Sequence, residues 1–586
     1  MEPQSPSQPV LILGAGINGC ALARELLLNG VSVCLVDQAD ISSGATAASS
    51  RLIHGGLRYL EYGESDLARE SLAERTRLLR LAPQSVRPLR LLIPVTNRFG
   101  GVLHSARKFL SVGHASGLPN RKRQARSLPH SARGWWLVRL GLWFYDHYAR
   151  DPTLPDSHTV ALDDPQAPPV SREKFRWLCA YYDAQIGFPE RFVLALLEDA
   201  RRLAAEHGLS FEVFTYHQAA LDGRVATVHR RGDRSRVARA FEPAAIVNAT
   251  GAWVDQTLAA LHVPSRRLIG GTKGSHFITP QARLREMIGD QGLYTEASDG
   301  RPIFILPFAD QTLVGTTDEP YDGDPADAVA REDELQYLLS AVQETLPGSG
   351  LTREDITLHY SGVRPLPFVD ASTPAAITRR HLLTEHRDAV VPTFSIIGGK
   401  LTTCRSLAEE TAATLLTRLG RAVRATSRER LIPGAEAWPG DAALEHAQRR
   451  LAERHGCSTQ QVAAMWTLCG TRVGEILATV NGPCENLDGT AIPHEFVRWV
   501  IQHEWVQTLD DLIERRLLLL YHHPLTAACL RQLAQLLVEA GLLEPNQIDE
   551  QVAASVERLK TRHGKQVLQE RESTTETRRH GDDANS

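Results

Sequence analysis

Residues 10–37 read VLILGAGINGCALARELLLNGVSVCLVD. An apolar segment leads into a G-x-G-x-x-G turn, and an apolar-faced helix then leads into a second apolar segment that ends in an acid. This order predicts a strand–helix–strand unit. Gly14 permits the tight turn, Gly16 lets backbone N–H groups approach a pyrophosphate, and Gly19 lets the helix pack closely on the strand. The helix N-terminus then faces the phosphates and Asp37 binds the adenosine ribose, so the unit predicts dinucleotide binding.

The bulk composition is that of an ordinary globular protein. The chain has 586 residues, too many for one hydrophobic core, so two or three domains are expected. Its net charge of −4 gives no global field that would draw it to nucleic acid. None of its eight cysteines forms a CxxC pair, so we expect free thiols in a reducing cytosol and no metal site. We see no signal peptide and no apolar run of about 18 residues, and expect a cytoplasmic protein.

The segment that follows Asp37 distinguishes between nicotinamide and flavin cofactors. A nicotinamide domain normally continues as compact strand–helix units, whereas residues 41–60 are rich in hydroxyl groups and then in glycine. Such a stretch can wrap around an extended ligand. Strand-then-glycine turns return at 248–251 and 398–403, where backbone can meet a cofactor. This segmented layout favours FAD.

Residues 98–139 have an unusual composition. They carry nine basic side chains interleaved with aromatic ones, and no acidic residue. The segment is either a solvated insertion or a surface that rests on anionic lipid, where basic charge attracts and aromatic rings anchor. The second interpretation adds peripheral contact with the cytoplasmic face of the inner membrane.

At this point the sequence resembles the FAD-dependent (aerobic, respiratory) glycerol-3-phosphate dehydrogenases. The resemblance covers most of the chain, from residue 10 to about 520. Its motifs keep their order and are residues 49–60 (SSRLIHGGLRYL), 248–254 (NATGAWV), 273–276 (KGSH), 315–318 (GTTD), 360–366 (YSGVRPL), 398–403 (GGKLTT) and 502–516 (QHEWVQTLDDLIERR).

The resemblance implies an α/β fold, α+β overall, in three parts. These are a Rossmann-like FAD-binding domain of the glutathione-reductase/D-amino-acid-oxidase type, a mixed-sheet substrate (cap) domain and an all-α C-terminal domain. We expect the FAD-binding domain at 9–68, 172–265 and 354–422, the cap domain at 69–171 and 266–353 with the basic insertion 98–139, the helical domain at 430–560, and a disordered tail at 562–586.

The implied reaction is oxidation of sn-glycerol 3-phosphate to dihydroxyacetone phosphate, with hydride passing to flavin N5 and electrons passing on to a quinone. Arg58, Arg364 and Lys400 match basic substrate-site positions of the family. Three cations beside glycine turns suit a phosphate clamp, since arginine can bind a phosphate through two hydrogen bonds. We therefore expect these three residues in both catalysis and substrate binding.

The group that takes the alcohol proton stays open at this stage. Tyr59 and His54 are the nearby candidates, and Arg364 could instead orient the hydroxyl. His54 has an alternative role as a backbone-bonded structural residue. His276 either binds the substrate or bridges strands.

The expected cofactor-binding residues come from separate parts of the chain. Beside the residues of the first strand–helix–strand unit, they are Ser49, Ser50, Leu52, Gly55 and Gly56 along the ribityl chain and ring, Gly251 and Trp253 over the adenine half, and Gly399, Lys400, Leu401 and Thr402 at a helix N-terminus facing the flavin.

Residues 187–191 depart from the commoner family pattern, which leaves substrate contacts open. Two alternatives to the implied activity also remain: an FAD-dependent oxidase or dehydrogenase of another small hydroxy or amino acid, and a non-catalytic FAD-binding sensor or assembly protein. Quinone and oxygen are both open as electron acceptors. The C-terminal helices could serve a homodimer or a contact between domains.

Overall fold

The computed structural model describes residues 8–57, 64–98, 134–149, 151, 153–368, 380–480, 485–522 and 524–568. Arg58 and Tyr59 and most of the basic segment lie outside these ranges. In the part of the chain that is described, no helix is both long and apolar enough to span a bilayer.

A six-stranded sheet contains the predicted strand–helix–strand unit. Strand β1 pairs in parallel with both β2 and β11, and β11 pairs in parallel with β19. The prediction that distant segments return to complete this domain is therefore confirmed. The strand order is β18 (Leu382–His386), β19 (Thr393–Ile397), β11 (Ala245–Asn248), β1 (Val10–Leu13), β2 (Val33–Val36) and β7 (Phe211–Phe214).

Alternate side chains of β1 enter cores on opposite faces of this sheet. Val10 and Ile12 pack with α1 (Ile17–Leu28), α6 (Pro189–His207) and α10 (Cys404–Arg418). On the other face, Leu11 and Leu13 pack with α7 and a three-stranded sheet. Continuous apolar strands are required because both faces are covered. The covering elements are α7 (Val254–Ala260), β8 (His217–Asp222), β9 (Val225–Arg230) and β10 (Asp233–Phe241).

The second sheet has ten strands, most of them paired antiparallel, and α8 (Ala282–Ile288) and α9 (Glu332–Thr345) lie on one of its faces. Helices α3 (Ser65–Leu81) and α5 (Trp135–Ala149) pack into the core of the other face. The strands are β16 (Glu319–Pro320), β12 (Thr272–Thr279), β15 (Gln311–Gly315), β14 (Pro302–Phe308), β13 (Gln291–Glu296), β4 (Val86–Val95), β6 (Trp177–Ile186) and β3 (Leu52–Ile53), with β17 (Leu358–Arg364) beside β12 and β5 (His158–Val160) beside β6.

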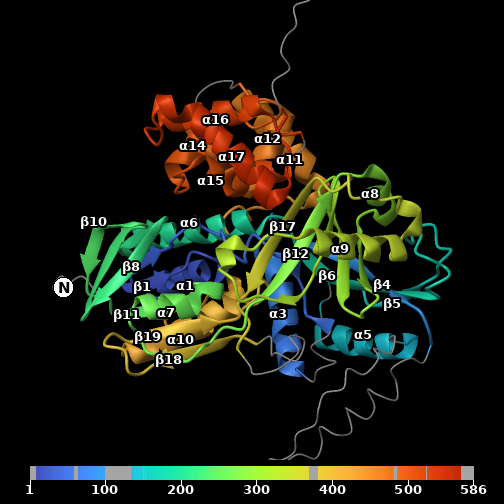
Figure 1. Ribbon diagram of the computed structural model, residues 1–586, viewed down its shortest axis with the longest axis horizontal. Helices are drawn as coiled ribbons and strands as arrows, with labels where there is room; N and C mark the ends of the chain where they lie inside the picture. Colours follow the sequence, from blue (N-terminus) through green and yellow to red (C-terminus); the bar gives the residue numbers. More distant parts are fainter. Residues whose placement is uncertain are drawn as a thin grey trace, which may run out of the picture.

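The C-terminal part of the chain is helical and lies across one end of both sheets, whereas α5 lies on the opposite side of the molecule (Figure 1). Its helices are α11 (Asp441–His455), α12 (Thr459–Cys469), α13 (Val473–Thr479), α14 (His494–His503), α15 (Leu509–Asp511), α16 (Ala527–Glu539) and α17 (Ile548–His563), with the short turns η7 (Leu512–Arg516) and η8 (Leu519–Tyr521) between α15 and α16.

Several expected boundaries differ from the structure. Strands β3, β6 and β17 lie in the second sheet, although their segments were expected in the FAD-binding domain. Helix α17 continues to His563, and Lys565 beyond it is buried, so the expected tail begins too early. The strands are assigned to the second sheet by their hydrogen-bonded neighbours, which no local pattern encodes.

Candidate active site

One cavity of about 1130 Å³ gathers most of the predicted residues. It is formed where β1, β2, β11 and β19 end, and it extends to the second sheet through β12 and β17. The carboxyl ends of parallel strands are the usual place for a ligand in an α/β sheet. The predicted residues that line it are Gly14, Gly16, Asp37, Ser49, Ser50, Leu52, His54, Gly56, Gly251, Trp253, His276, Arg364, Gly399, Lys400, Leu401 and Thr402.

Two predicted glycines do not line the cavity and serve packing instead. A Cβ at Gly19 would lie 1.9 Å from the Gly14 carbonyl oxygen, so Gly19 allows the close helix–strand approach. A Cβ at Gly55 would lie 2.4 Å from Leu72, and the Gly55 N–H donates to Tyr145 and Asp183. Gly55 therefore belongs to the packing behind the cavity wall, and its place along the ribityl chain stays a prediction.

The β1–α1 turn has the shape of a phosphate cradle. Gly14 has φ +105°, and a Cβ there would lie 2.6 Å from the Ala249 carbonyl oxygen. The N–H of Ile17, in the first turn of α1, donates to Thr46 Oγ1, which ties the turn to the loop after β2. Asn18 also lines the cavity, and its buried Oδ1 has no hydrogen-bond partner among the described residues. The open backbone and the helix N-terminus fit an FAD pyrophosphate, whereas the Asn18 oxygen is an acceptor and suits a donor group such as a ribityl hydroxyl.

Asp37 ends β2 at the edge of the same cavity. Its carboxylate accepts hydrogen bonds from the N–H groups of Ala15 and Ala39, at 2.7 and 2.9 Å. Burial raises the pKa of Asp37 to about 6, although both backbone bonds act to lower it. A buried carboxylate that still has acceptor capacity suits ribose hydroxyl groups.

The two returning segments close the cavity from further along the sheet. Trp253 follows the turn at Gly251, and its indole N–H donates to Asp324 at 3.1 Å. At the end of β19, Gly399 has φ +99° and a Cβ there would lie 2.5 Å from Asn18. Lys400 follows directly and lines the cavity at the start of the turn into α10. Both segments thus bring backbone to the cavity wall, as the sequence predicts.

Arg364, at the end of β17, supplies a cation on the second sheet's side. Its Nη1 donates to Asp318 Oδ1 at 2.9 Å and its Nη2 to Thr316 Oγ1 at 2.8 Å. Gly274 leaves room for the guanidinium group, since a Cβ there would lie 2.2 Å from Nη2. The arginine is therefore held in the cavity wall before any ligand is present.

His276 and His54 lie in different surroundings. The His276 ring is buried, stacks on Tyr360 at 4.9 Å between centroids, and lies 2.8 Å from Ser50 Oγ through Nε2. Burial and the charges of Arg364 and Arg51 lower the pKa of His276 well below its usual value, so the ring is neutral at pH 7. His54 is tied by its backbone N–H to Thr402 Oγ1 at 3.1 Å. Both residues line the cavity.

The atypical residues 187–191 contact the C-terminal domain. Glu190 pairs with Arg51. Arg191 makes two hydrogen bonds to the Glu504 carboxylate, at 2.6 and 2.8 Å. Neither Glu190 nor Arg191 lines the cavity, so this stretch joins domains.

Sequence reasoning missed several residues of the cavity wall. Asn18 and Asp318 lie inside quoted motifs, but their residue types alone gave no signal. Arg558 and Arg562 of α17 line the cavity from about 500 residues beyond the glycine-rich turn, and only the fold brings them there.

Comparison with known proteins shows the family to which the chain belongs. Residues 9–414 match the family model described as FAD dependent oxidoreductase. A glycerol-3-phosphate dehydrogenase from Synechocystis is 34% identical over 88% of this chain and 89% of its own. A D-erythritol 1-phosphate dehydrogenase from Brucella abortus is 30% identical over 86% of this chain and 93% of its own.

Among solved structures, the glycerol-3-phosphate dehydrogenase from Bacillus halodurans complexed with FAD has a TM-score of 0.67 and 20% identity, and the match covers 94% of both chains. This likeness supports the fold. The chain therefore belongs to the FAD-dependent oxidoreductases and, within them, to the glycerol-3-phosphate dehydrogenase family, with FAD as its cofactor.

Proposed function

We propose that this protein oxidises the C2 hydroxyl of sn-glycerol 3-phosphate to give dihydroxyacetone phosphate. The observation that carries the proposal is that Arg364 and Lys400 line the same cavity as the glycine cradle for FAD. FAD, which Gly14, Gly16 and Asp37 would hold, would supply the acceptor for the hydride. The chain's own residues bind the phosphate, orient the alcohol and exclude water.

The substrate phosphate is proposed to bind Arg364, Lys400 and Arg58. Asp318 neutralises Arg364 in the ligand-free protein, and a phosphate dianion competes for the same N–H groups with more charge. This cation set argues against an amino acid oxidase, for which one arginine would bind the carboxylate. His276, being neutral, offers a hydrogen bond to the substrate and no charge. His54 and Tyr59 remain the candidates for accepting the alcohol proton.

Anaerobic reduction of the purified protein tests the substrate. We expect sn-glycerol 3-phosphate to bleach the visible flavin absorbance, and glycerol without phosphate to leave it unchanged. D-erythritol 1-phosphate is the matched comparison, because a relative named for that substrate is 30% identical. If only D-erythritol 1-phosphate bleached the flavin, the substrate would be a longer polyol phosphate. If no phosphate ester bleached the flavin, the remaining interpretation would be a non-catalytic FAD-binding protein.

We further propose that a quinone accepts the electrons and that the protein meets this quinone at the surface of a membrane, to which it binds peripherally. We also propose that the protein forms a homodimer. Reoxidation of the substrate-reduced protein by a soluble quinone analogue, compared with oxygen, tests the acceptor. Faster reoxidation by oxygen would make the protein an oxidase.

A further inference from the structure

The loop between β2 and β3 surrounds the cofactor cavity, and a buried charged residue lies at each end of it. Residues 43–46 and 48–50 line the cavity. Asp40 precedes them and Arg51 follows them, and both side chains are almost completely buried. Buried charges need partners, and the location of these partners links the loop to the rest of the molecule.

The partners of Asp40 come from η7 in the C-terminal domain. Arg516 donates two hydrogen bonds to the Asp40 carboxylate, at 2.7 and 2.8 Å, and Arg515 Nε donates a third. Arg516 also donates to the Glu504 carbonyl oxygen, so its position is fixed by its own domain. Burial acts to raise the pKa of Asp40, but the two arginines hold it below its usual value.

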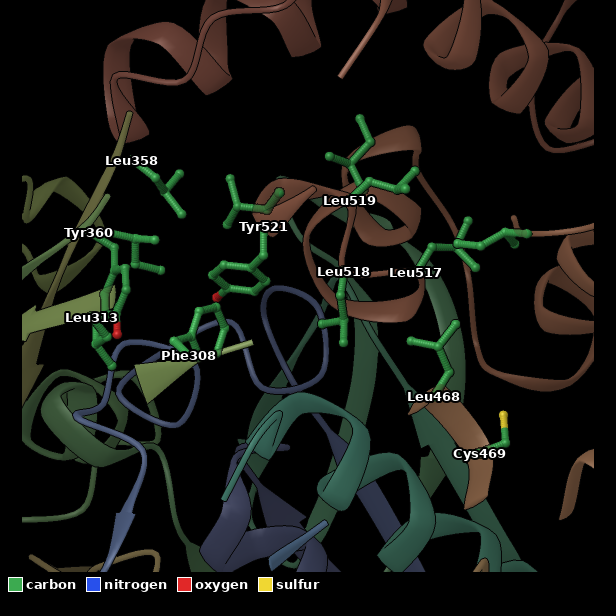
Figure 2. Packing of buried hydrophobic residues seen from close by; sticks show 14 of the residues in the cluster. Phe308, Leu313, Leu358, Tyr360, Leu468, Cys469, Leu517, Leu518, Leu519 and Tyr521 are labelled. Carbon is green, nitrogen blue, oxygen red and sulfur yellow. The ribbon is translucent and has the colours of Figure 1, made fainter. Parts of the chain in front are cut away.

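Arg51 has its charge partner, Glu190, on α6, and a further partner on η8 of the C-terminal domain. The Arg51 guanidinium lies 2.5 Å from the Tyr521 hydroxyl through Nη2 and pairs with Glu190. It also lies 4.7 Å from the Tyr521 ring centroid and 5.0 Å from that of Phe308. Figure 2 shows the Tyr521 ring next to Phe308, with Tyr360 to its left, inside the hydrophobic cluster that the second sheet and the C-terminal domain share. Arg51 has φ +57°, a conformation that a side chain of this size adopts only when its surroundings hold it.

We propose that residues 515–521 act as a clamp on the cofactor loop: Arg516 and Tyr521 are positioning residues that hold its two ends in the FAD-binding shape. Docking of the C-terminal domain and binding of FAD are then coupled. Because coupling is reciprocal, docking tightens FAD and FAD strengthens docking. The C-terminal domain thus becomes part of the cofactor site without contributing to the hydride step.

A matched control separates this clamp from ordinary contact between domains. The Arg191–Glu504 pair is also buried and also joins the C-terminal domain to the rest of the chain, but neither residue lies in the loop. Both contact Arg516 through backbone carbonyl groups, of Glu504 and of Arg516 itself, which Glu504→Gln keeps. Glu504→Gln loosens docking away from the cavity. Tyr521→Phe keeps the ring and removes the hydroxyl contact with Arg51, and Asp40→Asn weakens the other end.

The test measures the FAD dissociation constant by flavin fluorescence, together with hydrogen exchange of residues 41–50 and 512–521 in the full-length protein. We expect Tyr521→Phe and Asp40→Asn each to raise the dissociation constant at least about fivefold, because each loses at least one hydrogen bond, and Glu504→Gln to change it less than about twofold. FAD should slow exchange in both segments of the wild type.

Loss of the Asp40 charge would by itself strengthen FAD binding, which is opposite to the effect expected from the clamp and makes the test more stringent. Asp40 helps to raise the pKa of Asp37, so removing its charge would favour ionised Asp37 and tighter FAD binding. Weaker binding therefore has to come from the clamp. Equal dissociation constants in all three variants, or FAD that protects 41–50 and leaves 512–521 unchanged, would overturn the proposal. If Asp40→Asn does not fold, Tyr521→Phe against Glu504→Gln decides it.

Discussion

Two neighbouring side chains hold Arg364 in a position where it can bind an anion. Thr316 and Asp318 hold its guanidinium group, and about a quarter of the side chain remains exposed. Holding an arginine in place before binding lowers the entropy lost when a phosphate arrives. The residue is therefore more than a surface ion pair.

Arg364→Ala tests this role. Removing one partner of a buried charged contact costs about 2–5 kcal/mol, so we expect kcat/KM for glycerol 3-phosphate to fall by about two to three orders of magnitude. FAD content should stay unchanged. Arg364→Lys should recover part of the loss only, because an ammonium group cannot form the paired hydrogen bonds. Unchanged steady-state kinetics in the alanine variant would rule out the phosphate role.

The pH dependence of FAD binding follows from Asp37. Its pKa of about 6 means that the apoprotein increasingly holds a proton there as the pH falls through 6. Ribose hydroxyl groups donate to the ionised carboxylate, so FAD selects that form. FAD affinity should therefore be full above pH 6 and fall by up to about tenfold per pH unit below it. Titration of apoprotein with FAD measures this, and Asp37→Asn should give weaker binding with a flat profile between pH 5 and 7.

At the scale of elements, β12 shows how a buried strand can carry polar side chains to a cavity. Glu334 of α9 accepts hydrogen bonds from Lys273 at 2.6 Å and from Ser275 at 2.8 Å. These bonds satisfy the polar groups on one side of the strand. Gly274 and His276, on the other side, contact Arg364 and Ser50. Helix α9 thus fixes the strand that shapes the substrate end.

Gly274→Ala tests that arrangement. The new Cβ would lie 2.2 Å from Arg364 Nη2 and 2.6 Å from Thr316 Oγ1, so the guanidinium group must move. We expect KM for glycerol 3-phosphate to rise by about tenfold or more, with FAD binding retained, because phosphate contacts depend on geometry. Gly187→Ala is the control, since a Cβ there meets nothing within 4 Å. Equal kinetics in both variants would contradict this account.

At the scale of the whole molecule, the C-terminal domain and α5 lie on opposite sides (Figure 1). On the side of the C-terminal domain, the ion pairs of the clamp and of Arg191 are buried between that domain and the rest of the chain. The other presents Trp136, Leu140 and Trp143, which are about half exposed and recur at helical spacing on α5. The α5 face begins inside the basic segment 98–139 of the sequence, and aromatic and basic groups together suit an anionic lipid surface.

Sedimentation with anionic vesicles checks this surface. We expect the double variant Trp136→Ser with Trp143→Ser to lose most vesicle binding and to keep flavin reduction by substrate, because neither tryptophan lines the cofactor cavity. Leu542→Ser is the control, since that leucine is also exposed but lies after α16 in the C-terminal domain. Deleting 101–134 tests the basic segment separately. Equal sedimentation of all forms would exclude this side of the molecule as the lipid-binding surface.

The sequence by itself determined the strand–helix–strand unit, the positions of Gly14, Gly16 and Asp37, and the return of the chain at Gly251 and Gly399. These features are local: turn chemistry and apolar periodicity specify them wherever the rest of the chain goes. Only the tertiary structure decided that β6 and β17 join the second sheet, that Gly55 packs behind the cavity, and that the loop after Asp37 is held from residues 515–521. Those outcomes depend on contacts between separate elements, many of them about 80 residues or more apart in the chain, and buried charges such as Asp40 and Arg51 reveal their partners only once the chain is folded.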